Sequence, residues 1–167
     1  AVAVVAGPGS YTGLRVGMST AKGLCYALHI PLISLNTLAV MAYATNKEIL
    51  SSQLLCPMLD ARRMEVFTAL YDTALHELIA PCAMILEQNS FSAWLNKHEI
   101  IFFGTGSGKW KELVQHDNAI FRDSFYTTQD IAYISNNAFR QKAFSSLAYA
   151  EPFYLKDFYS PKKLMGQ

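Results

Sequence analysis

The chain opens with the pattern of a buried strand, a glycine-rich turn and an amphipathic helix, and this succession restricts its fold more than any other feature. Residues 1–6 (AVAVVA) are all small or apolar, which is typical of a buried strand. The turn GPGSYTG follows at residues 7–13, and a helix is predicted from Thr12 to His29 with Ser10 or Thr12 as its N-cap. A strand, a turn and a helix in this order indicate an α/β protein.

The predicted helix carries two candidate packing stripes, each with steps of three or four residues. The apolar stripe comprises Leu14, Met18, Ala21, Cys25 and Leu28, and the stripe of small residues comprises Gly13, Gly17 and Ala21. The apolar spacing predicts one buried face. The small residues would let a second helix approach closely, either from another molecule or from within the same domain, and the sequence leaves both alternatives open.

The rest of the chain alternates between strand-like and helix-like segments. Strands are predicted at residues 30–35, 54–59, 64–71, 100–103 and 119–121, and helices at residues 37–46, 90–97, 109–116 and 128–144. The runs 54–59 and 64–71 flank a short charged turn, which predicts a β-hairpin. Because this hairpin restarts the pattern, we expect a boundary between two lobes near residues 46–53.

Charge and hydropathy exclude two classes of protein. The 167 residues include 14 Lys and Arg against 13 Asp and Glu, a formal net charge of +1. Nucleic-acid binding draws its affinity from clustered cations, so this balance argues against a stand-alone nucleic-acid-binding protein. No apolar run approaches the ~20 residues that cross a bilayer. We therefore expect no membrane association.

The cysteines and histidines predict no site. Cys25, Cys56 and Cys82 are widely spaced and form no C-x-x-C pair, which argues against a disulfide framework or a zinc site and fits a reducing, cytoplasmic compartment. The histidines include no pair at i and i+4, so a zincin-type metal site is not encoded.

The two glycine-rich loops depart from the motifs that bind nucleotides. In the first loop the third glycine comes one residue later than in the dinucleotide fingerprint, and no acidic residue follows before Glu48. The second loop leads into Lys109 but has Phe103 and Trp110 where a P-loop needs Gly and Ser or Thr. Asp60 and Glu65 flank the hairpin turn and could form a catalytic pair, although an Asp at a hairpin is more often a turn former.

Four segments, in this order along the chain, resemble the signature of the bacterial TsaB (YeaZ) family. They are AGPGSYTGLRVG at 6–17, IPLISLNTL at 30–38, LDARRMEVF at 59–67 and AEPFYL at 150–155. The resemblance implies an actin-like, ribonuclease-H-like (ASKHA) α/β fold with two lobes. Residues 1–46 would be the remainder of the N-terminal lobe, truncated at its N-terminus, and residues 47–167 the C-terminal lobe with its C-terminal tail.

The same resemblance implies a non-catalytic subunit required for threonylcarbamoylation of N6 of adenosine 37 in tRNAs that read ANN codons. Its expected partners are the transferase TsaD and the ATPase TsaE. We expect tRNA to be bound mainly through the complex, and the chain to self-associate when TsaD is absent. ATP or ADP and a metal ion are expected on the partner subunits, and none on this chain alone. The alternatives are a metal-dependent glycoprotease-like peptidase and an actin-like ATPase.

The resemblance also suggests candidate site residues. The metal-binding His-x-x-x-His pair of TsaD falls here on Thr37 and Met41, which are poor metal ligands. The helix after the first glycine loop takes part in pairing in this family, so the partner-interface candidates are Gly13, Leu14, Gly17, Met18 and Ala21. The glycine-loop and turn candidates are Gly7, Gly9, Ser10, Thr12, Arg15, Asp60 and Arg62.

Overall fold

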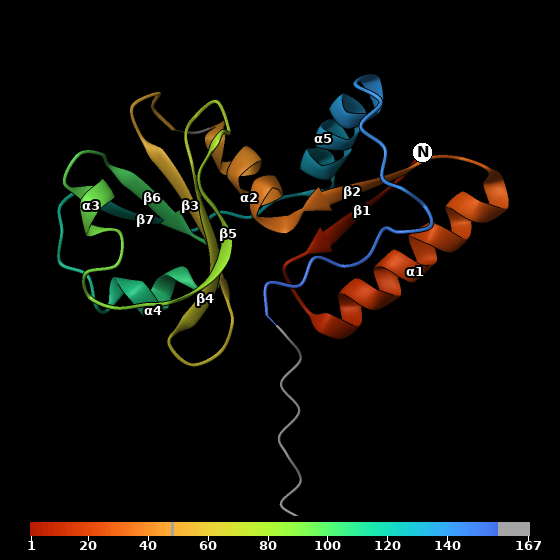
Figure 1. The fold of residues 1–167 in the computed structure, drawn as a ribbon. Coiled ribbons are helices and arrows are strands. Elements are labelled where there is room, and N and C mark those ends of the chain that lie inside the picture. The colour runs from red at the N-terminus through yellow and green to blue at the C-terminus, as the bar shows by residue number, and fades with distance from the viewer. Residues whose placement is uncertain (48, 157–167) are drawn as a thin grey trace, which may run out of the picture.

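The computed structural model describes residues 1–47 and 49–156, which form two lobes side by side (Figure 1). The first lobe is built on a two-stranded parallel sheet of β1 (Val2–Gly7) and β2 (Leu32–Asn36). Two helices pack on it, α1 (Tyr11–Leu28) and α5 (Thr128–Arg140). The expected strand, turn and helix at the start of the chain are therefore confirmed.

The side chains of β1 and β2 alternate between the two helices, as the strand period requires. Val4, Ala6 and Leu32 pack with the buried residues of α1, whereas Ala3 and Ile33 pack with α5. Both faces of this small sheet are thus covered.

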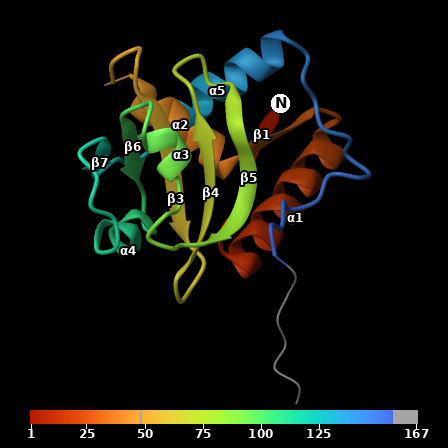
Figure 2. The same cartoon turned by 60° about the vertical axis from the view of Figure 1, so that its left-hand side comes forward.

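The second lobe contains a five-stranded sheet in the order β5-β4-β3-β6-β7. Its strands are β3 (Leu54–Asp60), β4 (Glu65–Tyr71), β5 (Glu77–Ile85), β6 (Ile100–Phe103) and β7 (Ala119–Arg122), and its helices are α3 (Ser92–Leu95) and α4 (Ser107–Lys111). The helix α2 (Thr37–Asn46) lies between the two sheets, because Val40 packs with β2 whereas Leu38 and Met41 pack with β3 and β6. The pairs β3–β4 and β4–β5 are antiparallel, and the pairs β3–β6 and β6–β7 are parallel. Figure 2 shows α2 on one side of this sheet and α3 and α4 on the other, and the two apolar clusters of the lobe divide in the same way.

Some element bounds differ from the prediction. The strand β5 was not expected, because it is an edge strand in which Pro81 interrupts the apolar run. The helices expected at 90–97 and 109–116 shorten to α3 and α4. The last helix ends at Arg140, followed by a left-handed Lys142 (φ 56°), which halts helical geometry.

The expected division at residue 46 does not account for a second crossing between the lobes. After β7 the chain returns to the first lobe, where α5 covers one face of the sheet and Ser145 forms a β-bridge with Leu32. Leu147 and Ala150 then pack against the α1 core. The first lobe thus includes the segment from Thr128 onward, while residues 157–167 of the expected tail lie outside the described residues.

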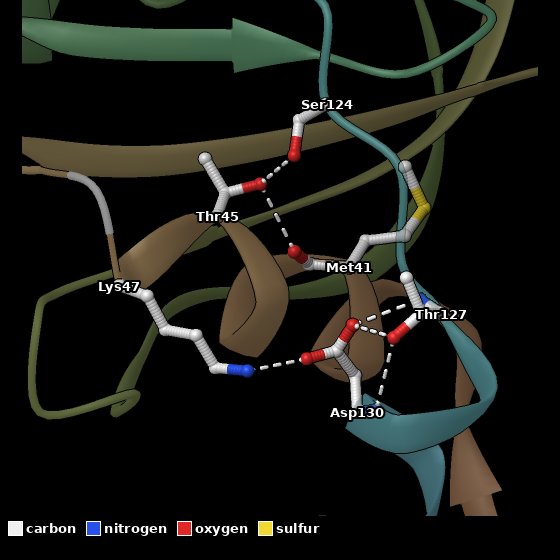
Figure 3. Close-up of polar contacts among 6 residues, drawn as sticks. All are labelled: Met41, Thr45, Lys47, Ser124, Thr127 and Asp130. Atoms are coloured by element: carbon white, nitrogen blue, oxygen red, sulfur yellow. Dashed lines mark hydrogen bonds and ion pairs between the residues drawn. The ribbon is translucent and has the colours of Figure 1, made fainter.

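Polar contacts tie this second crossing to the first, as Figure 3 shows. Thr45 near the end of α2 shares a hydrogen bond with Ser124 at 2.5 Å, and Lys47 Nζ lies 2.5 Å from Asp130 Oδ1. Asp130 also closes a capping box with Thr127 at the start of α5. Lys47 and Thr127 together lower the pKa of Asp130 to about 2, with Lys47 the larger cause. These polar contacts therefore join the two connections between the lobes.

The contacts of Asp130 should make the stability of the protein fall in acid. A carboxyl whose folded-state pKa lies below its unfolded value contributes stability above the unfolded pKa and loses it as pH falls. The Asp130 contribution, on the order of 1 kcal/mol because Lys47 is half exposed, should be lost between pH 5 and pH 2. Urea denaturation across this range should show a smaller acid-induced loss for Asp130→Asn than for the wild type. Equal losses would contradict this role for Asp130.

None of the helices among the described residues combines the length and hydropathy needed to cross a bilayer.

Candidate functional site

The first glycine loop is closed by the chain's own C-terminal segment. Gly7 has a φ of 124° and precedes a cis peptide bond to Pro8. A Cβ on Gly7 would lie 2.6 Å from the carbonyl oxygen of Phe153, and the Phe153 amide donates to the Ala6 carbonyl at 2.7 Å. The glycine is required by this close approach of two backbone segments. Ser10 then caps α1 by accepting from the Gly13 amide at 3.4 Å.

Residues 150–156, which we call the strap, join the first lobe to the hairpin of the second. The Arg15 guanidinium donates to the Tyr154 hydroxyl at 3.0 Å, and the Tyr154 ring packs on Tyr11 at 5.1 Å between centroids. Lys22 Nζ donates to the carbonyl of Ala150. At the far end of the strap, Lys156 forms an ion pair with Glu65 at the start of β4. Figure 1 shows the strap running between the lobes.

The hairpin turn and the second glycine loop meet through Asp60. The Asp60 carboxylate accepts from Lys109 Nζ at 2.6 Å and from the Arg62 amide at 2.6 Å, and the Asp60 amide donates to Thr105. The Lys109 hydrogen bond is the main cause that holds the pKa of Asp60 below its usual range. Lys109 also donates to the Glu65 carbonyl. Asp60 is therefore a turn former held ionised by a lysine, and Glu65 is engaged by the strap.

The glycines of the second loop are packing requirements as well. Gly104 has a φ of 96°, and a Cβ there would lie 2.5 Å from the Met58 carbonyl oxygen. A Cβ on Gly106 would lie 2.7 Å from Val66. The loop is thus pressed against the β3–β4 hairpin, and its glycines serve this contact.

Positions 37 and 41 do not fit a metal ion. Thr37 is buried and its hydroxyl has no hydrogen-bond partner, and Met41 packs in the apolar cluster beneath α2, with its methyl group close to Gly104. Neither side chain offers a carboxylate, an imidazole or a thiolate. Within residues 1–47 and 49–156, no group of three or more His, Cys, Asp or Glu side chains is placed to hold a metal.

The outward face of α1 is exposed and almost free of charge. The helix has two charged residues, and both are engaged by the strap: Arg15 by Tyr154 and Lys22 by the Ala150 carbonyl. The rest of the outward face is small, apolar or hydroxylated, and it comprises Thr12, Gly13, Val16, Ser19, Thr20, Gly23, Leu24, Tyr26, Ala27 and Leu28. Among these, Val16 and Leu28 are about 60% exposed (61% and 62%) and Tyr26 is 76% exposed. Four large apolar side chains, those of Val16, Leu24, Tyr26 and Leu28, are thus exposed on this one helix. Exposed apolar side chains that gather on one element are a feature of protein-binding surfaces.

The five partner-interface candidates differ in their exposure to solvent. Met18 and Ala21 are buried against β1 and β2, so they cannot line a surface of the free chain. Leu14 is half-buried over Gly7, and a Cβ on Gly17 would touch Val4. Only Gly13 of the five lies on the outward face.

Sequence reasoning missed the exposed apolar residues of α1. Val16, Leu24 and Tyr26 stand outside the buried stripe, and this excess of apolar residues on the remaining face was the available signal. Of the loop candidates, Gly9, Ser10 and Thr12 are exposed at the start of α1, and Arg62 is exposed on the hairpin turn.

Comparisons with known proteins identify the family of this chain. A family model described as TsaD, tRNA N6-adenosine threonylcarbamoyltransferase, matches residues 1–165. The "tRNA threonylcarbamoyladenosine biosynthesis protein TsaB" of Escherichia coli (strain K12) is 27% identical over 100% of this chain and 75% of its own length. The chain belongs to the TsaB (YeaZ) branch of the TsaD family. The TsaB protein of Bacillus subtilis (strain 168) is 33% identical over 68% of this chain and 50% of its own length.

Solved structures share the fold. The structure titled "YeaZ from Pseudomonas aeruginosa" matches with a TM-score of 0.70 and 23% identity, over 92% of this chain and 73% of that one. A second structure from Pseudomonas aeruginosa, described as similar to peptidase YEAZ, matches with a TM-score of 0.78 and 22% identity, over 92% and 72%. The actin-like α/β fold expected for a TsaB protein is therefore confirmed, and the chain spans about three quarters of these relatives.

Proposed function

We propose that this TsaB-family chain is a non-catalytic subunit of the machinery that attaches a threonylcarbamoyl group to N6 of adenosine 37 in tRNA. The observation that carries the proposal is the outward face of α1, where large apolar side chains are exposed. The two charged residues of the helix, Arg15 and Lys22, both donate hydrogen bonds to the strap. Such a surface is built to be covered by another protein, and TsaD is the partner that the TsaB name suggests.

A partner role without chemistry of its own is supported by the two loops and by α2. Both glycine loops are filled by the chain's own residues, and positions 37 and 41 carry Thr and Met where a metal pair would be needed. Within the part of the chain that the structure describes, no specific arrangement of side chains favours the peptidase or the ATPase alternative. ATP or ADP and a metal ion would then act on TsaD and TsaE, with tRNA bound mainly through the complex in the cytoplasm.

The same α1 face supports self-association when TsaD is absent, because an uncovered apolar helix face is stabilised by pairing with a copy of itself. In this proposal homodimer and heterodimer compete for one surface.

Co-purification tests the proposed function. The chain and the TsaD protein of the same organism should co-elute from size-exclusion chromatography, and added TsaD should dissolve any homodimer of the chain. Separate elution of the two proteins at micromolar concentrations, with no change in the mass of either by light scattering, would contradict the proposal.

A further inference from the structure

The turn between β3 and β4 holds two consecutive arginines in the left-handed backbone region. Arg62 has a φ of 71° and Arg63 a φ of 50°, whereas Gly, Asn and Asp are the residues that adopt these angles readily. The Ala61 amide donates to the Glu65 carbonyl and the Glu65 amide to the Arg62 carbonyl, so two backbone hydrogen bonds close the turn. Among the described residues, the other non-glycine positions with positive φ stand singly, so two in succession distinguish this turn from the others.

Both arginine side chains are exposed and unengaged. Within the described residues, neither guanidinium has a hydrogen bond or an ion pair. The two neighbouring acids are already paired with lysines, Asp60 with Lys109 and Glu65 with Lys156. These pairings neutralise the local carboxylates and leave the arginines available for an external partner.

The shape and composition of the tip favour a protein partner. Figure 1 and Figure 2 show the β3–β4 turn projecting beyond the end of the sheet. Met64 beside the arginines is 40% exposed, and arginine with methionine is a combination enriched at protein interfaces. A nucleic-acid site would need a broader field of cations, which a net charge of +1 does not supply. Arginine forks match carboxylates with two parallel hydrogen bonds.

We infer that the arginine tip, Arg62 and Arg63 with Met64, docks onto an acidic surface of the partner protein, forming a second contact separate from the α1 face. The identity of that partner as TsaD rests on the proposed function. The tip lies on the second lobe and α1 on the first, so the two contacts together would fix the orientation of the chain in the complex.

The test compares Arg62→Asn/Arg63→Asn with a control that removes the same charge. The control is Lys97→Asn/Lys142→Asn, which changes two exposed lysines that lie on other segments, Lys97 before β6 and Lys142 after α5. Lys142 also has a positive φ, as both arginines do. In calorimetric titration with the TsaD protein of the same organism, the arginine variant should bind at least tenfold more weakly, and the control should match the wild type. Wild-type affinity should also fall more steeply with added salt than that of the arginine variant.

Thermal unfolding separates binding from folding. Asn tolerates positive φ, so the arginine variant should melt at the wild-type temperature or slightly above it. Equal affinities of the wild type and the arginine variant for TsaD would overturn the tip as a contact and leave the proposed function standing. Unchanged TsaD affinity with a loss of affinity for tRNA would overturn it in favour of nucleic acid. A wild-type chain that forms no complex with TsaD would overturn both proposals.

Discussion

Changing Leu24 to glutamate should weaken the complex with TsaD about thirtyfold or more while leaving the fold intact. Leu24 lies on the outward face of α1 and is 47% exposed, so its loss removes little core packing from the free chain. In the complex, the carboxylate would be buried in an apolar contact without a partner, which is the most costly kind of interface substitution. A loss of 2 kcal/mol or more is typical of a central contact residue, and this corresponds to about a thirtyfold change in affinity.

The matched control for Leu24→Glu is Ala93→Glu, which places the same charge on an exposed residue of α3 in the second lobe. Calorimetric titration should show wild-type affinity for this control, and light scattering should show that only Leu24→Glu reduces the homodimer as well. If Leu24→Glu bound TsaD as tightly as the wild type, the α1 face would not be the partner surface.

Changing Trp110 to alanine should lower the free energy of unfolding by about 3–5 kcal/mol, the range measured for large aromatic residues in cores. Trp110 is fully buried in α4, and its ring contacts Phe91 at 5.3 Å and Phe102 at 4.6 Å between centroids. Its indole N–H donates to the Glu87 carbonyl at 3.2 Å. The substitution therefore leaves a cavity, breaks an aromatic cluster and removes a partner from the Glu87 carbonyl.

Trp94→Ala is the comparison for this substitution, because Trp94 is only partly buried at the edge of the same cluster. Urea denaturation should show a clearly smaller loss for Trp94→Ala than for Trp110→Ala. Similar losses would mean that the core of the second lobe is not centred on Trp110.

Local signals made the start of the chain predictable. The strand, the glycine turn and the helix that Ser10 caps follow from hydropathy, turn residues and capping within about 29 contiguous positions. The β3–β4 hairpin was predictable for the same reason, because its two runs flank a short turn. The fold class follows from this alternation of elements.

The features that could not be predicted depend on contacts between residues distant in sequence. Which stripe of α1 turns inward depends on where the sheet of the first lobe lies, and Met18 and Ala21 face it. The ion pair of Asp60 with Lys109 joins residues 49 positions apart, and the hydrogen bond of Arg15 with Tyr154 joins residues 139 apart. The outward face of α1 became visible as a candidate surface only once these long-range contacts had accounted for its charges.

Reconstitution of tRNA modification tests the central claim most directly. TsaD, TsaE, a threonylcarbamoyl donor and unmodified tRNA from the same organism would be incubated with and without this chain, and N6-threonylcarbamoyladenosine would be measured by mass spectrometry after nuclease digestion. The proposed role predicts that the modified nucleoside forms only when the chain and TsaD are both present, and that Leu24→Glu reduces its formation. Equal modification without the chain, or modification by the chain in the absence of TsaD, would contradict it.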